Sequence, residues 1–175
     1  MKLAFMNFSG WNWLSAADSV IRAYTRSKWS HVGVVLRTGN YIDAFPGGVG
    51  NTRHPSRFAR ANQHCILDVP LPEEHAAEQF LLAQFGKPYD YTAVLGFPFR
   101  RWNDDKKWYC SELVAGALQA GGMTIPDARW ISPQKLLEVV SQPQMVAHDC
   151  KVEGRMSIEA GKNCDWCGGI ENVLP

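Results

Sequence analysis

The segment from residue 110 to residue 122 places the strongest single constraint on how this chain folds. Cys110 stands at the head of an apolar series that recurs at helical spacing and stops at Gly121-Gly122. The pattern predicts a helix with Cys110 in or just before its first turn. There, free backbone N–H groups and the positive end of the helix dipole favour a thiolate, the nucleophilic form of cysteine. A small buried hydrophobic role for Cys110 is the alternative.

A nucleophilic cysteine needs a base, and the best candidate lies far upstream. His31 opens a β-branched run, which is typical of a strand. Neutral imidazole can take the proton of a thiol and return it to a leaving group, as nucleophilic catalysis by cysteine requires. Histidine at the start of a strand is also often structural, so the case for His31 depends on its occurring together with Cys110.

Length and composition indicate one folded domain with a real core, because the chain has 175 residues, 46% hydrophobic and 20% charged. A formal net charge of +1 gives no electrostatic argument for a nucleic acid or an anionic membrane as partner. Neither a signal peptide nor a membrane-spanning stretch is predicted, so a cytoplasmic product is expected. Release by lysis or packaging into a virus particle stays open.

Hydrophobic periodicity and turn signals predict the order of elements. Strands are expected over 2–8, 31–36, 41–45, 49–54, 64–69 and 144–148, and helices over 14–24, 72–85, 90–95, 110–120 and 133–140. A turn is expected at 38–40, and Asp90 and Ser132 are expected N-caps. A helix, a run of strands and then helices form an α+β pattern.

The last part of the chain carries a separate cysteine motif. Residues 1–150 are expected to form the catalytic domain, and residues 151–175 a Gly- and Cys-containing tail. Cys164 and Cys167 form a Cys-x-x-Cys pair, which is a common half of a zinc site, and His148 and Cys150 could supply further ligands. One such pair with scattered ligands is a weak pattern, so no metal is predicted. Five cysteines without an export signal also do not predict a disulfide framework.

Two pairs of motifs resemble the two halves of a known superfamily. Residues 30–35 and 41–48, which read SHVGVV and YIDAFPGG, resemble the histidine half of the NlpC-type papain-like superfamily. Residues 87–91 and 109–114, which read KPYDY and YCSELV, resemble its cysteine half. Because the histidine comes first, the chain resembles the circularly permuted branch. That branch holds the YaeF/YiiX-type cysteine amidases and, more distantly, the lecithin-retinol acyltransferase-like enzymes. The resemblance covers about residues 14–140.

The resemblance implies a fold and three site residues. The implied fold is a permuted papain-like one, a small antiparallel sheet or barrel with the cysteine helix packed against it. Cys110 matches the nucleophile, His31 the base, and Asp43 the third polar residue that orients the imidazole. In a flat hairpin with a three-residue loop Asp43 would pair near Val35, so its contact with His31 requires strong twist or a bulge. A solvated hairpin role for Asp43 stays open.

Other side chains near the motifs have weaker interpretations. The Tyr109 hydroxyl could help to bind an oxyanion, although the backbone N–H of Cys110 is the firmer donor. Tyr89 is expected in the core, and Glu112 is expected to be a favourable partner of the helix dipole. Tryptophans near these segments either line a substrate groove or pack in the core and at its rim; they are Trp11, Trp13, Trp29, Trp102 and Trp108.

The sequence thus predicts a cysteine hydrolase, a thiol-dependent amidase or peptidase, that forms an acyl-enzyme on Cys110. By resemblance the substrate is a peptide or isopeptide, for example in bacterial cell-wall peptides. The alternatives are an acyltransferase or thioesterase that acts on lipid acyl groups, and a non-catalytic binding module with the same fold. No cofactor, metal or nucleic acid is expected.

Overall fold

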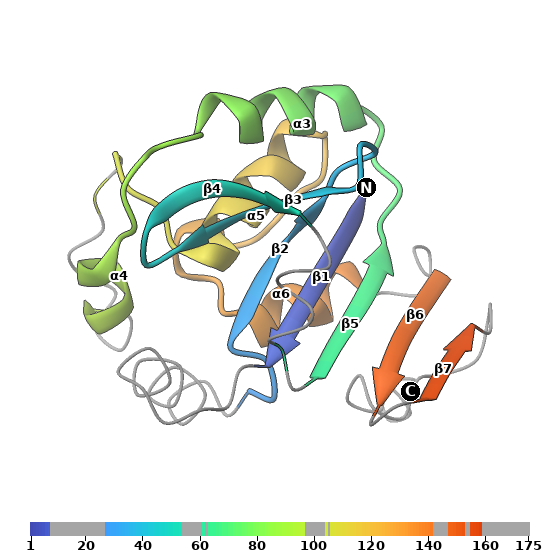
Figure 1. Cartoon of the computed structure of the whole chain (residues 1–175). Coiled ribbons are helices and arrows are strands. Elements are labelled where there is room, and N and C mark those ends of the chain that lie inside the picture. Colours follow the sequence, from blue (N-terminus) through green and yellow to red (C-terminus); the bar gives the residue numbers. More distant parts are fainter. Residues whose placement is uncertain are drawn as a thin grey trace, which may run out of the picture.

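The computed structural model describes residues 1–7, 27–53, 61, 63–96, 104, 106–141, 147–152 and 155–158. Its strands form an antiparallel sheet of spatial order β4-β3-β2-β1-β5-β6-β7 (Figure 1). The strands are β1 (Lys2–Asn7), β2 (His31–Val35), β3 (Asn40–Phe45), β4 (Gly48–Arg53), β5 (Gln63–Asp68), β6 (Ala147–Val152) and β7 (Arg155–Ile158). The helices are α3 (Glu74–Ala83), α4 (Tyr91–Gly96), α5 (Cys110–Ala120) and α6 (Pro133–Val140), with a short 3₁₀ turn η2 (Ala128–Trp130). The α+β prediction is confirmed.

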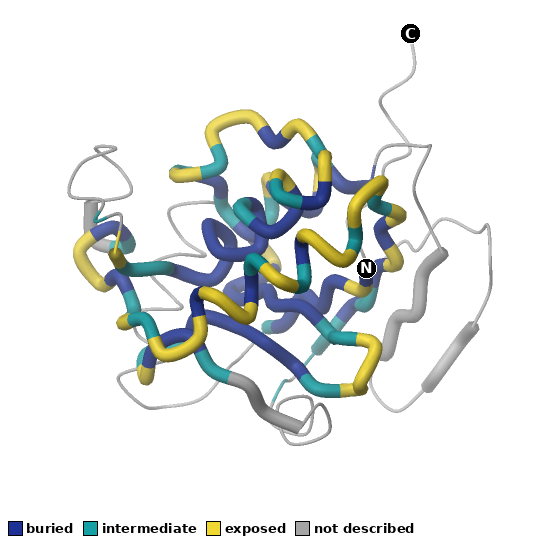
Figure 2. The backbone as a smooth tube through the Cα atoms, turned by 90° about the horizontal axis from the view of Figure 1, so that it is seen from above, coloured by how far each residue is buried: buried dark blue, intermediate teal, exposed yellow. Residues whose placement is uncertain are grey.

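The core lies between α5 and one face of the sheet. Strand β1 is central and pairs with β2 on one side and β5 on the other. Alternate β1 residues, Leu3 and Phe5, share a buried cluster with Val32 and Val34 of β2 and with Leu113 of α5. The residues between them, Ala4 and Met6, are also fully buried and form a second cluster with Tyr41, so β1 is covered on both faces. Figure 2 shows the buried backbone gathered in the interior and the exposed segments around it.

The hairpin between β2 and β3 has a tight three-residue loop at 37–39. The backbone N–H of Leu36 donates to the Asn40 carbonyl oxygen at 2.8 Å, so these two residues still pair. Gly39 has φ +78°, the left-handed conformation that three-residue hairpin loops use. Tyr41 is therefore opposite Val35. The turn predicted at 38–40 was wrong by one residue, because Asn40 already belongs to β3.

Three predicted helix ends are confirmed. Gly122, with φ +90°, follows the last turn of α5. The Ser132 hydroxyl accepts a hydrogen bond from the backbone N–H of Lys135 at 3.1 Å and caps α6. Asp90 Oδ1 accepts one from the backbone N–H of Ala93 at 2.8 Å, as an N-cap of α4 should.

The C-terminal strands extend past the expected domain boundary. The last predicted strand, 144–148, corresponds to β6, which begins at Ala147 and continues to Val152. Strand β7 then pairs with β6 inside the region expected to be a peripheral tail. The helix predicted at 14–24 and the Cys-x-x-Cys pair lie outside the described residues.

Candidate active site

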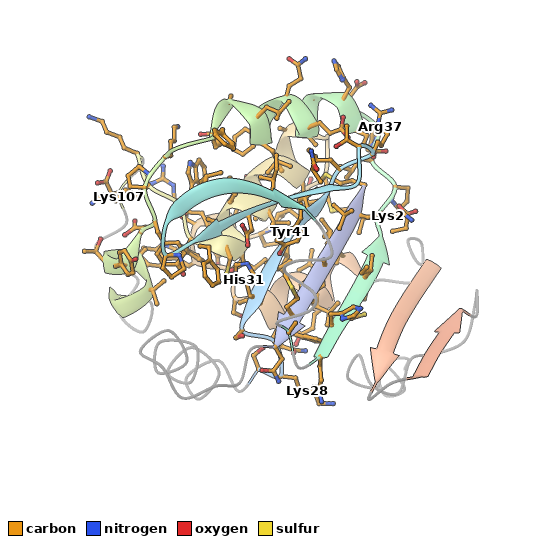
Figure 3. The ribbon with its side chains drawn as sticks, in the orientation of Figure 1. Lys2, Lys28, His31, Arg37, Tyr41 and Lys107 are labelled. Carbon is orange, nitrogen blue, oxygen red and sulfur yellow. The ribbon has the colours of Figure 1, made fainter. Side chains whose placement is uncertain are left out.

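Three predicted residues meet from three elements. His31 is the first residue of β2, Asp43 lies in β3, and Cys110 is the first residue of α5. Nε2 of His31 lies 2.8 Å from Oδ2 of Asp43, and the Cys110 side chain is also hydrogen-bonded to His31. Because Nε2 is taken by Asp43, Nδ1 is the ring nitrogen left for Cys110. Figure 3 labels His31 on β2, with β3 and α5 close by.

All three side chains are buried: the exposed fractions are 4% for His31, 0% for Asp43 and 3% for Cys110. The open alternative of a solvated Asp43 is therefore wrong. A carboxylate with no access to bulk water is stable only when hydrogen bonds or opposite charges compensate for its lost hydration. The imidazole of His31 supplies such a partner.

The register of the β2–β3 hairpin explains how Asp43 reaches His31. The paired residues are Val35 with Tyr41 and Val34 with Ile42, so Asp43 follows at the level of Gly33. The β2 position level with Asp43 is therefore two residues from His31. The flat hairpin predicted from the sequence would have placed Asp43 opposite Val35, four residues from His31. Diagonal neighbours in an antiparallel pair lie within reach of longer side chains. Because the loop lies at 37–39 and not at the predicted 38–40, the carboxylate of Asp43 lies within reach of the imidazole of His31.

Electrostatics favour a protonated His31. Burial is the largest single influence and lowers its pKa. The interactions with Asp43 and Cys110, hydrogen bonding first and charge second, outweigh burial and raise the pKa of His31 from 6.5 to about 10. The imidazolium therefore lies between a carboxylate and a cysteine sulfur. Phe45 meets the ring edge-on, with centroids 5.4 Å apart at 89°, and restricts its orientation.

Cys110 stands where a helix begins without an ordinary cap. Its predecessor Tyr109 is extended, with φ −105° and ψ 169°, and the Tyr109 side chain makes no capping hydrogen bond to α5. The Tyr109 hydroxyl donates instead to the Arg129 carbonyl oxygen at 2.6 Å. Its proton is thus committed elsewhere, and the backbone N–H of Cys110 is the better candidate donor to an oxyanion.

The two residues after Cys110 are more buried than the motif suggests. The Ser111 hydroxyl donates to the Ile131 carbonyl oxygen at 2.7 Å. Glu112 lies in the first turn of α5 as predicted, but it is only 5% exposed and lines a cavity of about 230 Å³. Ser111 had no assigned role in the sequence, and nothing local to it indicates a partner twenty residues away.

The segment before Cys110 is held by residues 87–91, which read KPYDY. Tyr89 and Trp108 form a parallel bridge, and the backbone N–H of Asp90 donates to the Trp108 carbonyl oxygen at 3.0 Å. The Asp90 carboxylate is fully buried and also accepts from the backbone N–H of Asp104 at 3.0 Å. Tyr89 is partly buried against the core, as predicted. Asp90 therefore anchors both α4 and the strand-like approach to the cysteine.

Trp29 and Trp108 pack against aromatic neighbours, and Trp108 also lines the cavity beside Glu112. Trp29 is buried, with its ring centroid 6.4 Å from that of Phe5. Trp108 lies edge-on to Phe80 at 5.6 Å, and its indole N–H donates to Gln84 at 3.1 Å. Trp11, Trp13 and Trp102 lie outside the described residues.

No family model, curated protein or solved structure matches the chain. No helix within the described ranges is both long and apolar enough to cross a bilayer. Over the same ranges, no group of three or more His, Cys, Asp or Glu side chains is arranged to hold a metal ion. The features of the chain that indicate a function are the contacts of Cys110, His31 and Asp43.

Proposed function

We propose that the protein is a cysteine hydrolase that cleaves an amide bond through an acyl-enzyme on Cys110. One observation carries the proposal. The buried contacts of His31 with Asp43 and Cys110 join a helix start to two strands, which is the arrangement of nucleophile, base and orienting group that such catalysis needs. Asp43 holds the imidazole in one orientation and stabilises its charged form.

In the proposed first half-reaction the Cys110 sulfur attacks the carbonyl carbon of the substrate. A C–S bond forms, and the carbonyl electron pair moves to oxygen, where the backbone N–H of Cys110 donates to it. The intermediate then collapses, the C–N bond breaks, and the His31 imidazolium gives its proton to the leaving nitrogen. The products are a free amine and a thioester on Cys110.

In the second half-reaction a water molecule attacks the thioester while neutral His31 takes one of its protons. The C–S bond breaks, the acyl group leaves as a carboxylic acid, and the thiolate of Cys110 is restored beside protonated His31. Asp43 stays hydrogen-bonded to Nε2 throughout and stabilises the imidazolium each time it forms. Protons and electron pairs balance with water as the only co-substrate.

For the substrate class we propose a peptide or isopeptide bond, which follows from the resemblance to the circularly permuted NlpC-type branch and its permuted papain-like fold. Bacterial cell-wall peptides are the leading example. The supporting motifs are the histidine half at 30–48 and the cysteine half at 87–114.

A second candidate, hydrolysis or transfer of a lipid acyl group, is favoured by aromatic side chains around His31. Phe45 contacts the imidazole ring, and the Tyr91 hydroxyl donates at 2.6 Å to the carbonyl oxygen of the next residue, Pro46. Tyr91 is 44% exposed and packs edge-on against Tyr89. Such a surface suits an apolar acyl chain.

The test is alkylation by iodoacetamide over a range of pH, in the intact protein and in His31→Ala. Mass spectrometry locates the label, with buried Cys65 as an internal control. We expect Cys110 to react at least about 10-fold faster in the intact protein than in the variant near pH 6.5, where an ordinary thiol is mostly protonated. Equal rates in the two proteins would refute the catalytic pair and favour a non-catalytic module.

A substrate comparison then separates the two candidate reactions. Peptide amides and acyl thioesters are offered to the intact protein and to Cys110→Ala. Release of amine from the peptide, lost in the variant, supports the amidase. Turnover of the long-chain thioester alone supports the acyl-group alternative.

A further inference from the structure

The first turn of α5 has different surroundings on its two sides. On one side Leu113 and Val114 are fully buried in the core. On the other, Glu112 and Gly116 line the cavity of about 230 Å³, and Gly116 also lies so close to Phe80 of α3 that an added Cβ would stand 2.8 Å from its ring. Residues 112 and 116 lie one turn apart on the same stripe of the helix, away from the 110, 113 and 114 positions. The core packs against one side of α5, and the other side combines the contact with Phe80 and the cavity.

Hydrogen bonds to a short segment add a restraint at the first turn of α5. The 127–131 strap contains η2 and begins at Asp127, which adopts the left-handed conformation with φ 49°. The backbone N–H of Trp130 donates to the Asp127 carbonyl oxygen at 2.8 Å, which closes the turn. Ile131 is buried in the core at the other end of the strap. Both ends of the strap thus have a defined position.

The strap receives one hydroxyl from each side of Cys110. Tyr109 donates to the Arg129 carbonyl oxygen at 2.6 Å, and Ser111 donates to that of Ile131 at 2.7 Å. One hydrogen bond before Cys110 and one after it restrict both the translation and the rotation of the helix start. Both hydroxyls belong to buried residues, and the hydrogen bond of Ser111 is itself buried, so it satisfies a polar group in the interior.

We propose that Tyr109 and Ser111 are positioning residues, which hold the Cys110 sulfur against His31 by clamping the first turn of α5 to the 127–131 strap. This inference rests on the proposed function, because it assigns the cause of the Cys110–His31 contact. Displacing a reacting group by about 1 Å is enough to lower a rate by about two orders of magnitude. The clamp acts through Cys110 and does not touch the substrate.

The test is the pH profile of Cys110 alkylation in full-length Tyr109→Phe, Ser111→Ala and the double variant. Each single variant is expected to react about 10-fold more slowly near pH 6.5, and the double variant as slowly as His31→Ala. At high pH, where every thiol is ionised, all rates should agree within about 2-fold. Gln119→Ala is the matched control, because it removes a hydrogen bond to the Ile125 carbonyl oxygen from the far end of the same helix.

A double-mutant cycle separates positioning from general loss of structure. In the His31→Ala background the clamp variants should cause no further loss near neutral pH, because the contact that they position is already gone. A merely structural role would change the rate again, because loosening the fold alters access to buried Cys110, and that result would overturn the inference even if a variant folds poorly.

Two remaining outcomes distinguish this inference from the proposed function. If the clamp variants keep the wild-type profile while His31→Ala loses it, the clamp is refuted and the proposed function stands. If the wild-type profile is that of an ordinary thiol and His31→Ala does not alter it, the proposed function fails and the clamp fails with it.

Discussion

Gly33 lies so close to Tyr41 that a Cβ atom at position 33 would overlap the tyrosine hydroxyl, and it would stand 2.8 Å from the Ile42 carbonyl oxygen. Tyr41, labelled in Figure 3, is fully buried. Gly33 stands between His31 and the last regular pairs of the β2–β3 ladder. The absence of a side chain there lets β3 approach β2 and brings Asp43 to the imidazole.

The first prediction follows from this contact. Gly33→Ala should lower the free energy of unfolding by about 1–3 kcal/mol, because the added methyl group forces buried atoms apart. Urea unfolding measures the change. Gly50→Ala is the control: it replaces the strand residue opposite Asp43, where an added Cβ meets open space, and should change stability little. Equal stability of Gly33→Ala and the wild type would contradict the close contact.

The second prediction concerns the charge that Asp43 provides. Asp43→Asn should lower the pKa of His31 from about 10, because burial continues to oppose the charged imidazole while the carboxylate no longer stabilises it. NMR titration of the imidazole resonances measures the pKa directly. Asp68→Asn, which alters a carboxylate on the distant strand β5, should leave it unchanged. An unaltered titration in Asp43→Asn would rule out the assigned role of the carboxylate.

The third prediction is a dependence of stability on pH. The pKa of His31 is higher in the folded state, about 10, than its ordinary value of 6.5, so the folded state binds this proton more tightly. The resulting stabilisation is fully present below about pH 6.5 and is lost as pH rises towards 10. The difference in free energy of unfolding between the wild type and His31→Gln should therefore shrink over this interval. A constant or growing difference would show that His31 holds no additional proton.

Local signals were sufficient to predict the elements that carry the site. The spacing of apolar residues and the glycines after it gave the bounds of α5, and the β-branched run placed β2 at His31. Asp90 and Ser132 were recognisable as caps because capping depends on neighbours a few residues away. These features are properties of short stretches of chain, which a sequence displays directly.

The distance between His31 and Asp43 needed more than a local pattern. A loop placed one residue later would move the carboxylate two residues along β2, and only the Leu36–Asn40 pairing decides between the two registers. Gly33 did carry a usable signal, because glycine inside a strand often marks the close approach of another group. That signal would have favoured the observed register.

No pattern in the sequence predicts the hydrogen bonds of Tyr109 and Ser111 to the 127–131 strap. Tyr109 and Ser111 donate to backbone carbonyl oxygens, and every residue has one, so no side chain in the 127–131 strap identifies the acceptor. Burial of Glu112 was equally unpredictable, because it depends on how the neighbouring segments pack around the first turn of α5.

Two of the three candidate site residues are close in the sequence, and the third is far from them. His31 and Asp43 are twelve residues apart in one hairpin, whereas Cys110 arrives on a helix from much later in the chain. In the proposed hydrolase, a molecule in which α5 is undocked would still hold its imidazole and carboxylate together but would have no nucleophile in place. The observed rate is then the intrinsic rate multiplied by the docked population. Any ligand that binds the docked state more tightly would then activate the proposed hydrolase without altering Cys110, His31 or Asp43.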